Sequence, residues 1–102
     1  MSQSISLADL TADHFEPLVG QGFRVRHPEH EETLTLERLE RKNAPIMGRI
    51  PFSLFFRGES QTVLLNQHIH PMDQESLGQL EIFLVPIGRN PDGTHEYQAV
   101  FS

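Results

Sequence analysis

Three short segments in the second half of the chain are almost wholly apolar. They cover residues 52–58, 82–88 and 97–101, and each is bounded by glycine, proline or the end of the sequence. Runs of this length, rich in aromatic and branched residues, are typical of buried β-strands. The pattern predicts a small β-fold with these three segments at its centre.

A helix is expected near the start of the chain. Within residues 6–20, apolar side chains recur with a rough 3.6-residue spacing, and Ser6 or Thr11 is a suitable N-cap. Pro17 cannot lie deep inside a helix. Either a short helix opens near Asp13 with Pro17 in its first turn, or the helix breaks at Pro17.

Elsewhere the period changes to two, which is the spacing of strands. Six strands are predicted, over residues 23–26, 33–39, 52–57, 62–69, 79–87 and 95–101. Leu39 is out of phase with Leu34 and Leu36, which predicts a bulge near Glu37 or Arg38. The segments between the strands are expected to be turns and loops, among them a polar loop over 70–78 and a hairpin turn over 90–93.

Six strands with short connections and one early helix predict a mainly β fold. The sheet is expected to be antiparallel and to curl into a small barrel or a two-layer sandwich, in a single domain over residues 1–102. The predicted inward side chains are Phe15, Leu18, Phe23, Val25, Leu34, Leu36, Phe52, Leu54, Phe56, Leu65, Ile82, Leu84, Tyr97, Ala99 and Phe101.

Two of the predicted strands are apolar on both alternating faces. An antiparallel strand with one wet face alternates, so a continuous apolar run implies that something covers its second face. The cover is either the chain itself, through its helix or barrel wall, or a second chain. In the second case the interface residues are Phe55, Arg57, Phe83 and Val85, and self-association through an exposed sheet edge is the simplest form.

Composition narrows the function classes. The chain has no cysteine, which removes thiol catalysis, disulfides and cysteine-based zinc sites and fits a cytoplasmic protein. Its net charge of −6 disfavours nucleic acid as a partner. The residues at the start of the sequence do not resemble a signal peptide, and no apolar run is long enough to span a membrane.

An ordered set of short motifs resembles a family of short bacterial domains of unknown function. The motifs are Phe-Ser-Leu-x-Phe-Arg-Gly at 52–58, Phe-Leu-Val-Pro-Ile-Gly at 83–88 and Tyr-x-Ala-Val-Phe at 97–101. The resemblance covers most of the chain and implies no assigned activity. It implies a structural or assembly role in a phage-tail-like system, beside which relatives are found.

One set of polar residues has the spacing of metal ligands. His68 and His70 alternate on a predicted strand, so their side chains share a face, and Glu75 follows five residues later. This spacing resembles the first metal motif of the cupins, and His95 or His27 is the available further ligand. The opposing interpretation is that both histidines are ordinary surface residues at a strand end.

Two function hypotheses follow. The leading one is a non-enzymatic interaction or assembly domain without a cofactor, which binds a protein partner or itself, in the cytoplasm and away from membranes. The alternative is a metal-binding, cupin-like small barrel or metal-dependent enzyme that uses a divalent metal at His68, His70 and Glu75.

Overall fold

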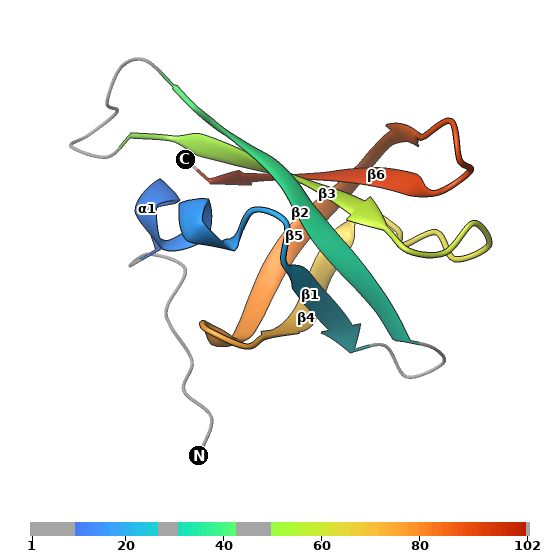
Figure 1. Ribbon diagram of the computed structural model, residues 1–102, viewed down its shortest axis with the longest axis horizontal. Helices are drawn as coiled ribbons and strands as arrows, with labels where there is room; N and C mark the ends of the chain where they lie inside the picture. Colours follow the sequence, from blue (N-terminus) through green and yellow to red (C-terminus); the bar gives the residue numbers. More distant parts are fainter. Residues whose placement is uncertain (1–9, 27–30, 43–49, 102) are drawn as a thin grey trace.

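The computed structural model describes residues 10–26, 31–42 and 50–101, and its strands form a closed antiparallel barrel (Figure 1). Along the chain the elements are α1 (Ala12–Phe15), the 3₁₀ helix η2 (Glu16–Leu18), β1 (Gly22–Arg26), β2 (Glu31–Arg41), β3 (Phe52–Gly58), β4 (His68–Gln74), β5 (Gly78–Arg89) and β6 (His95–Phe101). The prediction of a mainly β fold is confirmed, and the barrel is the correct one of its two alternatives.

The strands follow the order β1-β2-β3-β6-β5-β4 around the ring, and β4 returns to β1. The pairs Arg24–Asp73 and Val25–Met72 close the ring. β5 pairs with β4 along its first half and with β6 along its second, so it links two parts of the wall. Because the ring is closed, none of the described strands is a free edge strand, so the exposed edge on which the predicted self-association depended is not present among them.

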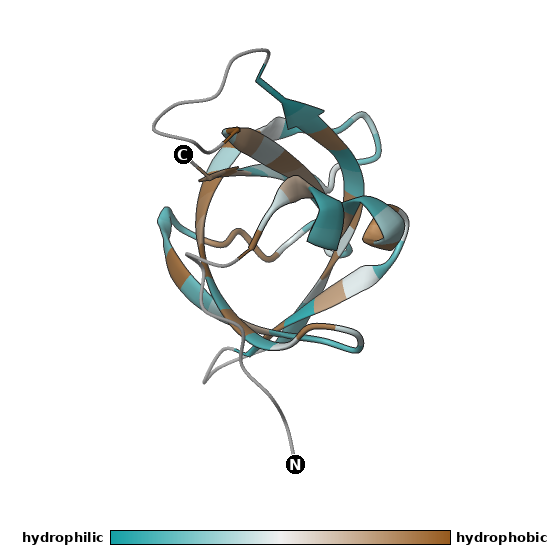
Figure 2. Cartoon of the chain, turned by 90° about the vertical axis from the view of Figure 1, so that its left-hand side faces the viewer, coloured by the Kyte–Doolittle hydropathy of each residue, from teal (hydrophilic) through white to brown (hydrophobic). Residues whose placement is uncertain are grey.

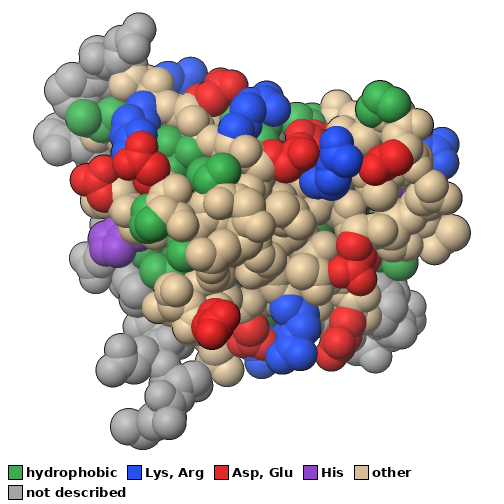
Figure 3. Space-filling view, in the orientation of Figure 1, with side chains coloured by type: hydrophobic (Ala, Val, Ile, Leu, Met, Phe, Trp, Pro, Cys, Tyr) green, Lys and Arg blue, Asp and Glu red, His purple; other side chains and the backbone are tan. Residues whose placement is uncertain are grey.

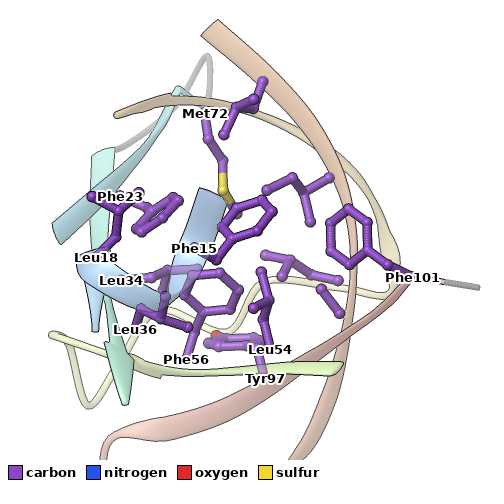
Figure 4. Close-up of a cluster of buried hydrophobic side chains, with 14 of the residues drawn as sticks. Phe15, Leu18, Phe23, Leu34, Leu36, Leu54, Phe56, Met72, Tyr97 and Phe101 are labelled. Atoms are coloured by element: carbon purple, nitrogen blue, oxygen red, sulfur yellow. The ribbon is translucent and has the colours of Figure 1, made fainter. Parts of the chain in front are cut away.

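The interior is filled by apolar side chains from all six strands and from α1. Every predicted inward residue is buried, and Phe15 lies near the centre of the cluster (Figure 4). Its ring centroid is 5.5 Å from that of Phe101, 5.8 Å from that of Phe52 and 6.3 Å from that of Phe23. Figure 2 shows α1 in front of the opening of the ring, so the helix closes this end of the barrel.

The helical segment is shorter than the prediction. Its α-helical part begins after Thr11, whose amide donates to Nδ1 of His14 at 3.0 Å. Pro17 then falls in the first turn of η2, where its missing N–H is tolerated. The α-helix therefore ends at Phe15, just before Pro17, which is the second of the two predicted alternatives. Residues 6–9 of the predicted helix lie outside the described residues. None of the described helices is long and apolar enough to cross a membrane.

The bulge predicted in the second strand is confirmed. The register between β2 and β3 shifts between Leu36 and Arg38, so Glu37 is the extra residue. The predicted hairpin turn is also present: the Gly93 amide donates to the Asn90 carbonyl at 2.9 Å, and Gly93 has a φ of +92°. This positive φ is a conformation that glycine adopts without steric cost.

The fourth strand lies further along the chain than predicted. Residues 62–67 form a loop, and the segment assigned to a polar loop instead holds most of β4. Polar contacts explain the difference. The Ser60 amide donates to the buried carboxylate of Glu32 at 3.1 Å, and the Leu65 amide donates to the Tyr97 hydroxyl at 2.9 Å. These bonds hold the loop across the barrel, with Leu65 buried, in place of a strand ladder.

Candidate functional site

An apolar area lies on the outer surface where β4, β5 and β6 meet. Along β5, Ile82 and Leu84 point inward and are buried, so Phe83 between them points outward and is 47% exposed. Ile69 of β4 is the register partner of Phe83 and is 52% exposed. Directly opposite residues in an antiparallel pair are close enough for their side chains to touch. Phe83 and Ile69 therefore form the centre of this area.

Two valines extend the area toward β6. Val85 is half-buried and pairs with Gln98. Val100 follows Gln98 by two residues on the same face of β6 and is 60% exposed. The four residues Ile69, Phe83, Val85 and Val100 are called the β5 face below. Monomeric proteins rarely expose contiguous apolar patches larger than a few hundred Å², and the largest patch on a monomer is often functional.

The predicted interface residues divide between two places. Phe83 and Val85 belong to the β5 face, whereas Phe55 and Arg57 lie on β3. Phe55 is only 6% exposed, because the guanidinium of Arg38 covers its ring at 3.8 Å from the centroid. The second apolar face of β3 is thus covered by the chain itself, and that of β5 is exposed.

Arg57 is held by carboxylates of its own chain. Its Nη1 donates to Asp92 at 3.0 Å, and its Nε lies 3.1 Å from Glu37, an ion pair without the geometry of a hydrogen bond at Nε. Arg57 is therefore better explained as part of a local charge network than as an anchor for a partner.

Ion pairs of this kind are concentrated on the wall opposite the β5 face. β2 and β5 occupy opposite positions in the six-strand ring. Five arginines on β1, β2 and β3 lie within 4 Å of a carboxylate: Arg24, Arg26, Arg38, Arg41 and Arg57. In Figure 3 the basic and acidic side chains lie next to one another around the margins of the face that is shown. The arginines of these pairs thus lie on β1, β2 and β3, and the β5 face lies across the ring from β2.

The charge network contains one carboxyl that resists ionisation. Burial raises the pKa of Glu96, and a hydrogen bond and charge repulsion from Glu37 raise it further, against smaller opposing effects of Asn90 and Arg38. A raised pKa in the folded state stabilises the fold at pH values below the unfolded pKa, and this stabilisation is lost as pH rises through the folded pKa.

We therefore expect Glu96→Gln to raise the melting temperature at neutral pH by a few degrees. The amide is isosteric and neutral, so it removes the repulsion from Glu37 and the desolvation of a charge. Thermal melts between pH 4 and 8 measure the effect, and the gap between variant and wild type should narrow toward acid pH. A variant that is less stable than wild type at pH 7 would contradict this account of Glu96.

The structure brings two of the three predicted metal ligands together and leaves the third apart: the ring centroids of His68 and His70 lie 5.8 Å from each other. His68 is exposed at the start of β4, whereas Glu75 follows the other end of the same strand, about 20 Å away at the usual rise per residue. His70 is buried and its Nε2 is 2.8 Å from the Asn66 carbonyl oxygen. Within the described ranges no three His, Asp or Glu side chains are grouped so as to hold a metal ion. His95 is separate from this set, and His27 lies outside the described residues.

The two histidines should differ in their effect on stability. His70→Ala removes a buried ring and leaves the Asn66 carbonyl without this partner, which is expected to cost about 1–2 kcal/mol. His68→Ala alters an exposed side chain and should change stability by less than about 0.5 kcal/mol. Chemical denaturation with and without added Zn²⁺ measures both, and a stabilisation by Zn²⁺ that His68→Ala abolishes would restore the metal hypothesis.

The sequence pattern located half of the β5 face. Phe83 and Val85 were found because they interrupt the expected alternation of β5. Ile69 was missed because the fourth strand was predicted to begin too early in the sequence. That placement put Ile69 on the same face of the strand as the inward residue Leu65. The sequence did contain a signal for the correct position of this strand: Met72 is apolar, lies inside the predicted polar loop and is buried in the structure. Val100 was missed because it lies between the inward residues Ala99 and Phe101, and nothing in the sequence distinguishes it from other outward positions.

Comparison with curated proteins and with solved structures gives no match. Comparison with protein families gives a match that covers residues 10–101, nearly the whole chain and all six strands. It agrees with the resemblance to a family without assigned activity that the short motifs indicated. The chain belongs to the family described as a domain of unknown function, DUF6916.

Proposed function

We propose that this barrel is a non-enzymatic interaction or assembly domain and that it binds its protein partner through the β5 face. The observation that carries the proposal is the half-exposed Phe83 beside its equally exposed register partner Ile69. Half-exposed side chains of this size present on the order of 100 Å² each, so Ile69, Phe83 and Val100 together expose roughly 300 Å². Burying that area in a complex would stabilise it by about 7 kcal/mol before the costs of association.

The polar groups inside the barrel support a structural role. Glu32 accepts the Ser60 amide, Tyr97 accepts the Leu65 amide, and His70 contacts the Asn66 carbonyl. Each of these contacts ties the loop before β4, or β4 itself, to the barrel. These groups therefore have a structural use, and the barrel interior is occupied by the apolar core.

The finer parts of the proposal rest on composition and on the family resemblance. The domain acts in the cytoplasm, without a cofactor and with neither nucleic acid nor a membrane as its partner. The net charge of −6 and the pairing of arginines with carboxylates support the exclusion of nucleic acid. A place in a phage-tail-like assembly is supported by the resemblance alone.

A photo-crosslinking amino acid placed at position 83, in the chain expressed in its native host, tests the proposal. Val19 is the matched control position, because it is 44% exposed and follows η2, far along the chain from β5. The expected result is a discrete adduct of defined mass from position 83 and none from position 19. Equal, diffuse labelling from both positions would overturn the assignment of the β5 face.

A further inference from the structure

We propose that the partner of the β5 face is a basic protein segment, which places an apolar side chain on Phe83 and Ile69 and a lysine or arginine beside Glu81. This inference rests on the proposed function, because it uses the same surface. It goes further in stating the chemistry of the partner.

The segment that carries most of the β5 face is acidic. Between Arg57 and Arg89 the sequence has no lysine or arginine, whereas it has four carboxylates, those of Glu59, Asp73, Glu75 and Glu81. This segment includes the whole of β4 and all of β5 except its last residue. It therefore contributes −4 to the net charge of −6. The negative charge of the chain is thus concentrated around the β4–β5 hairpin.

Glu81 lies at the edge of the β5 face. It is exposed and precedes Phe83 by two residues on the same side of β5, which corresponds to about 7 Å along the strand. Its register partner on β4 is Pro71, which has no charge, and the next outward pair along the hairpin is Ile69 with Phe83. Within the described ranges no cationic nitrogen lies within 4 Å of the Glu81 carboxylate. This carboxylate is therefore available to a cation from another molecule.

The arginines of β1 do not neutralise Glu81. β1 borders β4 on the side away from β5. Arg26 and Arg24 both lie within 4 Å of Asp73 on β4, at 3.2 Å and 3.9 Å. Asp73 thus holds these two cations at the far side of β4, and the charge of Glu81 is left to the outer surface of the hairpin.

An occupant of this surface has to match an apolar centre with a negative charge beside it. Burial of Phe83 and Ile69 supplies the attraction between apolar surfaces. A cation beside Glu81 adds an ion pair, which sets the orientation of the partner and speeds its association. An acidic partner would meet Glu81 and the net charge of −6 with charges of the same sign, and so would a second copy of this chain. Charge complementarity therefore favours a basic segment.

The test uses the purified chain with the photo-crosslinking amino acid at position 83, mixed with a lysate of the native host. The yield of the discrete adduct is measured as NaCl is raised from about 50 mM to about 500 mM. The expected result is a fall in yield, because salt screens the attraction between Glu81 and the partner's cation. This measurement needs no further substitution.

Two substitutions at position 81 then locate the effect, after each variant is checked for an unchanged melting temperature. Glu81→Gln should lower the adduct yield at low salt about two- to fivefold, as expected for the loss of one exposed ion pair. Glu81→Lys should lower it about tenfold or more, because like charges then meet. Glu31→Gln is the matched control and should leave the yield unchanged. It changes the net charge by the same amount, at an exposed carboxylate on β2, across the ring from β5.

Three outcomes would overturn the inference. An adduct whose yield does not fall with salt, or one that both substitutions of Glu81 leave at the wild-type yield, would exclude a basic partner while the interaction function stands. An equal loss in Glu31→Gln and Glu81→Gln would trace the effect to net charge, without a contact at Glu81. If position 83 gives no discrete adduct at any salt concentration, the proposed function fails, and this inference fails with it.

Discussion

Replacing Phe15 by alanine is expected to lower the free energy of unfolding by about 3–5 kcal/mol. Phe15 is fully buried and its ring lies against those of Phe23, Phe52 and Phe101, so truncation leaves a cavity where α1 closes the barrel. A loss of that size is a large share of the total stability of a small domain. The melting temperature should fall by about 15–30 °C, which differential scanning calorimetry measures.

Phe83→Ala is the matched control for this change. It removes the same side chain from a half-exposed position, so it should alter the stability of the isolated chain by less than about 1 kcal/mol. Equal losses at positions 15 and 83 would contradict the assignment of Phe15 to the core and of Phe83 to the surface.

Tyr97→Phe is expected to cost about 1–3 kcal/mol, although it removes only one oxygen atom. The Tyr97 hydroxyl accepts the amide of the buried Leu65, so the phenylalanine variant leaves a buried N–H group without that partner. Burial also raises the pKa of Tyr97, and the nearby Glu32 raises it further against the opposing hydrogen bond. The hydroxyl therefore stays protonated across the neutral range.

Hydrogen exchange measured residue by residue separates the local effect of Tyr97→Phe from the global one. The Leu65 amide should lose protection by more than the amides of β2 and β3, because its bond to Tyr97 fixes the loop before β4. Phe56→Leu is a suitable comparison, since it perturbs the register partner of Tyr97 without touching this bond. If the Leu65 amide exchanges at the same rate in wild type and Tyr97→Phe, the loop has another anchor.

Much of the fold was predictable because the inward positions follow the period of their elements. The alternation of Phe52, Leu54 and Phe56 on β3, and of Ile82 and Leu84 on β5, gave the inward face of both strands directly. The bulge in β2 was predictable for the same reason, since Leu39 breaks the phase of the strand. These inferences use only local spacing, which the sequence contains.

The errors came from contacts between residues that are distant in the chain. Val63, Leu64 and Leu65 have the composition of a strand, yet the bonds from Glu32 and Tyr97 hold this segment as a loop. No local pattern contains a partner more than 25 residues away. The start of β4 was misplaced for this reason, and with it the outward position of Ile69.

Contacts between residues distant in the chain also limited the prediction of the candidate site. Phe55 and Phe83 both occupy the second face of a continuous apolar run, and local spacing does not distinguish them. Arg38, brought next to Phe55 by the β2–β3 register, covers one of the two. The outward face of β5 has no such neighbouring arginine on β4 or β6, because its register partners there are Ile69 and Gln98. Strand order therefore decides which of the two apolar runs, the one on β3 or the one on β5, keeps an exposed face.

Photo-crosslinking from position 83 in the native host tests the central claim, that the β5 face binds a protein partner, most directly. A discrete adduct of defined mass is expected from position 83 and none from position 19. The adduct should be lost when Ile69, the register partner of Phe83, is replaced by aspartate with the fold unchanged. Equal, diffuse labelling from both positions, or an adduct that Ile69→Asp leaves unaltered, would contradict the claim.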